Sequence, residues 1–213
     1  MAVRKVSNRG GNVIGKFPSL KMRRMIAFES LLERDFIYLL EYDAQVTWYE
    51  EQPVTIEYQH VGKTKHYTPD FHLVEQGRDV LVECKPEKFA DREETRRKAT
   101  IARKWRAQHG WEFRIVVDNQ VRAGFRLQNI KLLIQYARQK VNPVLKGRIY
   151  TVLQESGGQM QMSEIVRTIP VEQGARVENA ILYMAFHHQV MVQLDTAPLS
   201  KETFICLAME ENR

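Results

Sequence analysis

Residues 66–86 read HYTPDFHLVEQGRDVLVECKP, which predicts two short strands joined by a tight turn at Gln76-Gly77. Both runs are rich in apolar and β-branched residues, and the short polar link between them suits a hairpin turn. If Glu75 pairs with Arg78 across the turn, the antiparallel register places Asp70 opposite Glu83. The rest of the predicted fold is built outward from this hairpin.

The predicted hairpin has one polar face and one apolar face. Because side chains alternate along a strand, Asp70, Glu83 and Lys85 share a face in this register. The opposite face is apolar, with Phe71, Leu73, Val80, Val82 and Cys84. A pair of carboxylates at one corner of a sheet can hold a divalent ion that prefers oxygen ligands, and Mg²⁺ is the usual cellular choice. The Lys85 ammonium would orient a water, help its deprotonation or stabilise a charged transition state.

An upstream helix offers a third acid. Apolar residues recur at three- and four-residue steps from about Arg24 to Glu41, which predicts a helix over that range. Glu33 falls among the apolar positions of this helix, and a buried carboxylate is costly unless it is paired or binds a cation. The alternative is a half-exposed glutamate at the edge of the apolar stripe. Glu29, one turn earlier, is a weaker candidate for the same site.

The other elements predict an α/β fold. Residues 46–53 and 54–60 are expected to join the hairpin in a meander of strands. A helix should follow from Asp91, as N-cap of a capping box with Glu94, to about His109, with Gly110 as its stop. Residues 111–118 predict a strand parallel to Val80–Cys84, and residues 126–140 a further helix. The basic 91–109 helix is either a solvated face or a DNA-binding one.

Three regions are expected along the chain. Residues 1–20 are a basic flexible arm, which is loosely ordered or meets phosphates or a partner protein. Residues 21–142 form the α/β domain, a mixed sheet flanked by helices. Asn142-Pro143 marks a boundary. Residues 143–213 predict three helices, at 144–155, from Ser163 as N-cap, and at 172–188, then strands at 191–194 and 204–208, as in a small winged-helix-like domain.

Composition limits the partners and the compartment. The chain has 213 residues, 44% of them hydrophobic, which suits a globular protein. A formal net charge of +6 favours a polyanionic partner. Two cysteines suggest a reducing compartment rather than a disulfide framework. The sequence shows no apolar run long enough to span a bilayer, so a cytoplasmic protein without a membrane partner is expected.

The spacing of Pro69-Asp70 and Glu83-Cys84-Lys85 resembles the signature of the PD-(D/E)xK nucleases. Four stretches together resemble the TnsA-type transposase endonucleases: Glu29-Ser30-Leu31-Leu32-Glu33, Glu51-Gln52-Pro53, Tyr67-Thr68-Pro69-Asp70-Phe71 and Val82-Glu83-Cys84-Lys85-Pro86. The resemblance covers about residues 25–140 and implies a restriction-endonuclease-like sheet. It implies Glu33, Asp70, Glu83 and Lys85 as catalytic residues. The implied metal ligands are Asp70, Glu83, Glu33 and the backbone carbonyl of Cys84, for Mg²⁺ or a substituting Mn²⁺, with Gln52 and Glu29 as accessory residues.

The resemblance also implies an activity and partners. The expected enzyme is a Mg²⁺-dependent DNA endonuclease that cuts double-stranded DNA at the 5′ ends of a bacterial transposon during cut-and-paste transposition. A DDE transposase (TnsB-like) would make the 3′ cuts, an AAA+ regulator (TnsC-like) would be a further partner, and the protein would act at the nucleoid. Two alternatives stay open: a free-standing restriction or repair endonuclease of the same superfamily, and a non-catalytic winged-helix DNA-binding protein.

Overall fold

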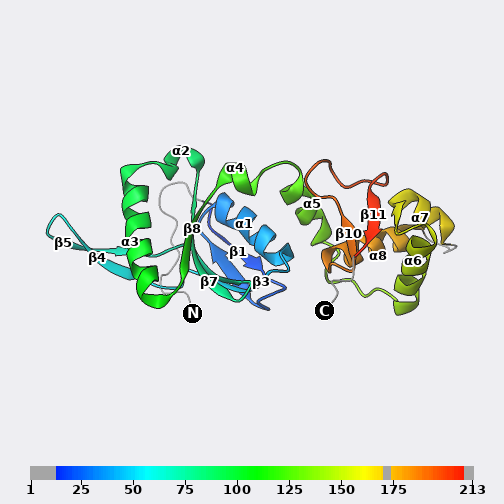
Figure 1. The fold of residues 1–213 in the computed structure, drawn as a ribbon, viewed down its shortest axis with the longest axis horizontal. Coiled ribbons are helices and arrows are strands. Elements are labelled where there is room, and N and C mark those ends of the chain that lie inside the picture. Colours follow the sequence, from blue (N-terminus) through cyan, green and yellow to red (C-terminus); the bar gives the residue numbers. More distant parts are fainter. Residues whose placement is uncertain (1–12, 170–173, 209–213) are drawn as a thin grey trace. The chain divides into compact units, whose positions relative to one another are not determined.

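The computed structural model describes residues 13–169 and 174–208, which form two compact units divided between Arg122 and Ala123 (Figure 1). Most of the predicted N-terminal arm, residues 1–12, lies outside the described residues. The arm prediction is wrong from Gly15 onward, because Gly15–Pro18 (β1) is a strand paired with Met25–Phe28 (β2). None of the helices in the described ranges is long and apolar enough to cross a membrane.

A four-stranded mixed sheet forms the centre of the N-terminal unit. Its order is β3-β6-β7-β8, made of Val46–Glu51 (β3), Phe71–Glu75 (β6), Arg78–Lys85 (β7) and Glu112–Val117 (β8). The strands β3, β6 and β7 are antiparallel neighbours, whereas β7 and β8 are parallel. The predicted α/β class and the predicted parallel pairing are therefore confirmed.

The central hairpin has the predicted register. Glu75 pairs with Arg78, and the ladder continues to Phe71 opposite Val82. Gln76 and Gly77 both have positive φ, 52° and 76°, as a two-residue turn of type I′ requires. The ladder ends before Asp70, because the strand predicted from His66 is interrupted at residues 68–70.

The predicted meander is wrong in its order. Ile56–His60 (β4) and Lys63–Tyr67 (β5) pair only with each other, and β3 lies next to β6 instead. The hairpin is separate because of where its apolar side chains pack. Ile56 and Tyr67 are buried against Ala102 of Glu93–His109 (α3) rather than in the core of the sheet. The β4–β5 hairpin therefore extends away from the sheet beside α3 (Figure 1).

The first helix is shorter than the prediction. It spans Leu31–Tyr42 (α1), because residues 25–28 are strand β2 and the Ser30 side chain accepts the N–H of Glu33 as N-cap. Ile26 and Glu29 are therefore outside the helix. Lys21 holds the other end of α1, since its ammonium donates to the carbonyls of Leu40, Asp43 and Val46.

The second predicted helix is also changed at its start. Glu87–Ala90 (α2) precedes α3, whose N-cap is Arg92 without a side-chain bond, so the predicted Asp91–Glu94 capping box is not formed. Gly110 does end α3, with φ 72° in the left-handed region. A short helix, Asp118–Val121 (α4), follows β8.

Helices lie on the two faces of the sheet. On one face, Phe36 of α1 meets the Phe71 ring edge-on, with centroids 5.7 Å apart. On the other, the His72 ring stacks on Trp111 at 4.0 Å, and Trp111 contacts Trp105 of α3. Because both faces are covered, the open side of the sheet is its end, where β7 finishes.

The C-terminal unit combines helices with a small sheet. Its elements are Arg126–Leu133 (α5), Pro143–Glu155 (α6), Gln159–Gln161 (β9), Met162–Thr168 (α7), Gly174–Phe186 (α8), Val190–Val192 (β10) and Phe204–Leu207 (β11). The sheet order is β10-β11-β9. Strand β9 was not predicted, α5 ends seven residues early, and α7 begins at Met162 with Gln161 rather than Ser163 as N-cap. The winged-helix interpretation stays a prediction.

The compact units divide about twenty residues before the predicted boundary at Asn142-Pro143. The cause is Asn129 of α5, which is 1% exposed. Its amide donates to the carbonyls of Leu194 and Ala197, and its oxygen accepts the N–H of Leu199, each at 2.8 Å. These bonds fasten α5 to the loop between β10 and β11, so α5 belongs to the C-terminal unit.

Replacing Asn129 should destabilise this unit. In Asn129→Ala, two carbonyls and one N–H lose their buried partner, so we expect the free energy of unfolding to fall by about 2–4 kcal/mol. Urea denaturation of the full chain measures the change. Gln135→Ala removes an exposed amide bonded to the Lys131 carbonyl and is the matched control. A loss below about 0.5 kcal/mol for Asn129→Ala would contradict this role.

Candidate active site

A cavity of about 670 Å³ opens at the end of the central sheet. It lies where β7 finishes and where the chain enters β6, and α1, α3 and α4 complete its wall. All four predicted catalytic residues line it, together with the accessory residue Glu29. Its charged lining residues are the acids Glu29, Glu33, Asp70, Glu83, Glu94 and Asp118 and the bases Lys85, Arg92, Lys98 and Arg122.

Glu83 is the most buried acid of the cavity, with 2% of its surface exposed. One carboxylate oxygen accepts the Lys85 ammonium at 2.8 Å, and the other accepts the Tyr67 hydroxyl at 2.9 Å. The contact with Lys85 agrees with the prediction that the two side chains point the same way from β7. Two donors therefore hold the Glu83 carboxylate in one orientation.

Asp70 lies beside the last residues of β7 rather than on the face of the sheet. Its Oδ2 accepts the backbone N–H of Cys84 at 2.7 Å. Its own carbonyl accepts the N–H of Gln52 at 2.9 Å. The predicted proximity of Asp70 and Glu83 is thus met at the point where the ladder stops, and the backbone of β7 fixes the carboxylate.

Glu33 reaches the cavity from the first turn of α1. Its Oε2 accepts the N–H of Glu29 at 2.7 Å, and its Oε1 accepts the Ser30 hydroxyl at 2.9 Å. The side chain is half-buried, as the alternative interpretation of this glutamate expected. Glu33 therefore also caps its own helix. The spacing Ser30-x-x-Glu33 is typical of a capping box and could have located the helix start from the sequence.

Gln52 links the two sides of the site. Its side-chain amide donates to Glu29 at 2.8 Å, while its backbone N–H holds the Asp70 carbonyl. Its φ of 48° is in the left-handed region, which is uncommon for a residue with a side chain. The side-chain oxygen is buried and meets no hydrogen-bond donor among the described residues. The predicted accessory role of Gln52 and Glu29 stays a prediction, although both are in contact.

Two acids of the site, Asp70 and Glu33, have a raised pKa. Burial raises the pKa of Asp70 well above its ordinary value, and the charges of Glu83 and Glu33 raise it further. Burial likewise raises the pKa of Glu33. Burial alone would lower the pKa of the Lys85 ammonium, but the Asp70 and Glu83 carboxylates outweigh this and raise it. Lys85 is therefore a cation at neutral pH.

The donor set suits a hard divalent cation. Among residues 13–169 and 174–208, no three His, Cys, Asp or Glu side chains are gathered closely enough to hold a metal ion as they stand. Mg²⁺ needs fewer protein ligands, because it keeps several of its waters. Three carboxylates face one ammonium here, an excess of negative charge that adds to the effect of burial in raising the pKa of Asp70. A divalent cation at Asp70 and Glu83 would relieve that excess.

Tyr67 and Arg122 have no signal in the sequence, whereas Arg92 and Lys98 belong to the basic 91–109 helix, for which a DNA-binding face was one of the two predictions. Tyr67 is placed by β5 and its hydroxyl reaches Glu83, yet it occupies an ordinary apolar strand position. Arg92, Lys98 and Arg122 bring cations to the cavity from α3 and from the end of α4. Only the folded arrangement brings these positions together, because they are far apart along the chain.

One comparison with known proteins finds a similar family. Residues 43–118 match the family model described as TnsA-like endonuclease N terminal. The match covers roughly a third of the chain and includes Asp70, Glu83 and Lys85. A comparison with curated proteins finds no match for the chain. The domain supports a nuclease of the TnsA type, and the predicted restriction-endonuclease-like fold agrees with it.

Because the carboxylates lie close together, the free energy of unfolding should depend on pH. Since the pKa of Asp70 is raised in the folded state, the folded protein binds this proton more tightly than the unfolded chain does. The free energy of unfolding should therefore fall as pH rises from about 4 through the raised pKa. Asp70→Asn keeps an acceptor for Cys84 and removes the charge, so it should be more stable than wild type at pH 8 by on the order of 1 kcal/mol.

Thermal unfolding of both proteins between pH 4 and pH 8 measures this difference. The difference should vanish near pH 4, where both proteins are neutral at this position. Asp91→Asn, which removes a carboxylate that is 93% exposed, is the control and should change little. If Asp70→Asn were less stable than wild type at pH 8, the account of the crowded charges would be wrong.

Proposed function

We propose that the protein is a metal-dependent DNA endonuclease whose active site is the cavity at Asp70, Glu83 and Lys85, because residues 43–118 match the TnsA-like endonuclease N-terminal family model. The observation that carries the proposal is the contact of the Lys85 ammonium with a Glu83 carboxylate that is 2% exposed, beside Asp70. Two acids and one cation are thus fixed at the open end of a rigid sheet. Phosphodiester hydrolysis requires such charges, because the reaction develops negative charge on oxygen.

Each charged or polar residue of the cavity is suited to a separate role in the reaction. Lys85, held protonated by its neighbours, is suited to donate to the negative oxygens of the transition state. Tyr67 keeps the Glu83 carboxylate in place while Lys85 contacts substrate, because its bond uses the other oxygen. Arg92 and Lys98 on the wall are suited to neutralise the phosphates that approach the cavity, whereas Arg122 is paired with the buried Asp35 at 2.9 Å.

We propose Mg²⁺, with Mn²⁺ as a substitute, as the cofactor. Asp70, Glu83 and the backbone carbonyl of Cys84 would hold the ion, with Glu33 as the further acid of the site. The ion supplies positive charge to the phosphodiester and makes water more acidic. The excess negative charge of the carboxylates supports this assignment.

A TnsA-like domain implies a role in a transposition system that acts on DNA. We propose that the protein is the subunit that cuts double-stranded DNA at the 5′ ends of a transposon, beside a DDE transposase (TnsB-like) and an AAA+ regulator (TnsC-like). The C-terminal unit, with its helices and three-stranded sheet, is proposed to bind DNA or a partner in the manner of a winged helix. The net charge of +6 supports a partner that is a polyanion.

Loss of the Asp70 carboxylate or of the Lys85 ammonium should abolish cleavage. In the reconstituted assembly with its partner proteins, DNA and Mg²⁺, we expect Asp70→Ala and Lys85→Ala each to slow cleavage by about 100-fold or more. The rate of strand scission on end-labelled DNA is the measurement, and a thermal melt shows that the variants are folded. Glu155→Ala, an exposed acid of the C-terminal unit, is the control and should cleave as wild type. Retained cleavage by the Asp70→Ala/Lys85→Ala double variant would contradict the assignment.

The position of the cut separates transposition from restriction or repair. On DNA that contains a transposon end, the proposed subunit should cut only the strand whose 5′ end belongs to the element. Mapping the cut on each labelled strand, with and without the DDE transposase, measures this. Cleavage of both strands at internal sites without any partner would instead favour a free-standing nuclease.

A further inference from the structure

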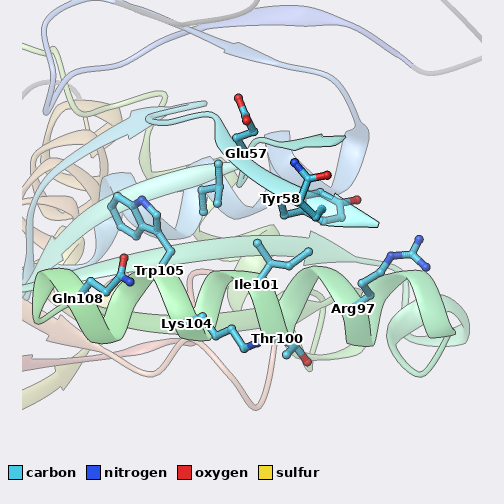
Figure 2. Close-up of a pocket in the computed structure, with 10 residues that line it drawn as sticks. Glu57, Tyr58, Arg97, Thr100, Ile101, Lys104, Trp105 and Gln108 are labelled. Carbon is cyan, nitrogen blue, oxygen red and sulfur yellow. The ribbon is translucent and has the colours of Figure 1, made fainter. Parts of the chain in front are cut away.

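A second hollow, of about 500 Å³, lies between the β4–β5 hairpin and α3. Figure 2 shows that Ile101 and Trp105 rise from α3 toward the hairpin, with Tyr58 above them. The floor is apolar because these side chains pack on the small core formed by Ile56, Tyr67 and Ala102. The groove has no part in the site chemistry described so far.

The helix wall of this groove carries cations, whereas the one charged residue among those that line its hairpin wall is the acid Glu57. On the helix wall, Arg97 and Lys104 line the hollow. On the hairpin, the antiparallel register pairs Lys65 with Tyr58 and Lys63 with His60, so these lysines share the face of the strand that also carries Ile56 and Tyr67. Both lysines are exposed. Positive charge therefore borders the apolar floor from α3, and Lys63 and Lys65 add positive charge on the hairpin outside the lining of the hollow.

Acidic and basic residues occupy different parts of α3 along its length. Its acids, Glu93 and Glu94, are confined to the first turn, whereas residues 95–109 carry six cations and no acid: Arg96, Arg97, Lys98, Arg103, Lys104 and Arg106. Acids near a helix N-terminus are explained by the helix dipole. The run of cations beyond them exceeds what the dipole or solubility requires, and a polyanion is the partner that it suits.

Arg97 is only partly satisfied within the chain. Its Nε is buried and meets no hydrogen-bond acceptor among the described residues, and its nearest ion-pair partner, Glu93, is 3.8 Å away. That glutamate is 94% exposed, so the pair contributes little. A phosphate in the groove would give this guanidinium an acceptor, since a guanidinium fits phosphate with paired hydrogen bonds.

The groove and the candidate active site have no lining residue in common, but both lie along α3. Lys98, next to Arg97 on α3, lines the active-site cavity. Tyr67 packs with the floor of the groove and donates its hydroxyl to Glu83. A ligand that follows α3 from the groove toward its N-terminal turns is therefore led to the acids.

We propose that the groove between the β4–β5 hairpin and α3 binds the sugar–phosphate backbone of duplex DNA next to the active site, through Arg97 and Lys104. An acidic protein segment would also meet these cations. DNA is favoured because the cations extend over several turns of α3 and reach the phosphodiester-cleaving site. The inference rests on the proposed function in taking DNA as the substrate, and it is tested without cleavage.

Binding of a labelled 30-base-pair duplex by the full-length protein in EDTA, followed by fluorescence anisotropy between 50 and 200 mM salt, tests the groove. We expect Arg97→Gln/Lys104→Gln to raise the Kd about tenfold and to reduce the slope of log K against log salt by about 2, one for each lost phosphate contact. Lys16→Gln/Arg78→Gln removes the same two charges from exposed positions outside the groove and is the matched control.

The control variant should keep the wild-type Kd and slope. Equal values for the two double variants, or no binding by the wild type at 50 mM salt, would overturn the proposal, and equal values would point to a protein segment as the occupant. Thermal melts show that both variants are folded. Because EDTA removes any metal-dependent reaction, failure of the nuclease assignment would leave the binding result unchanged, so the two ideas fail separately.

Discussion

The main constraint on the N-terminal unit is that it must hold several carboxylates close together at one end of its sheet. Glu33, Asp70 and Glu83 meet there with one ammonium, Lys85, and burial makes their mutual repulsion costly. A protein selected only for stability has no reason to build such a cluster, because carboxylates in partly dry surroundings raise their pKa values instead of contributing stability. Function is the ordinary explanation of such a site, and the TnsA-like endonuclease domain agrees with it.

The surrounding elements supply the donors that keep these charges in place. The end of β7 gives Asp70 a backbone N–H, the β5 residue Tyr67 gives Glu83 a hydroxyl, and the first turn of α1 gives Glu33 two donors. Gln52 adopts a left-handed φ to reach both Glu29 and Asp70, a conformation that costs of order 1 kcal/mol. The site therefore depends on four separate segments of the chain, and each contributes a hydrogen bond that orients one of the acidic residues.

Prediction from the sequence succeeded where neighbours along the chain decide the geometry. The turn at Gln76-Gly77 determines the register, and the register brings Asp70 near Glu83 and turns Lys85 toward Glu83. Prediction from the sequence failed where tertiary packing determines which elements lie together. The strands predicted at 54–60 and from His66 were placed in the central sheet, yet Ile56 and Tyr67 pack against α3. For the same reason the bond from Tyr67 to Glu83 and the groove beside α3 could not be foreseen. The start of α1 was missed although Ser30 carried its signal.

The central claim is that Asp70 and Glu83 hold a divalent cation beside Lys85. Anomalous scattering from crystals of the full-length protein grown with Mn²⁺ tests this claim most directly. The account predicts a Mn²⁺ peak bounded by the carboxylates of Asp70 and Glu83, which disappears in crystals of Asp70→Asn. Saturating Mn²⁺ with no peak at these carboxylates, or a peak that persists unchanged in Asp70→Asn, would contradict it.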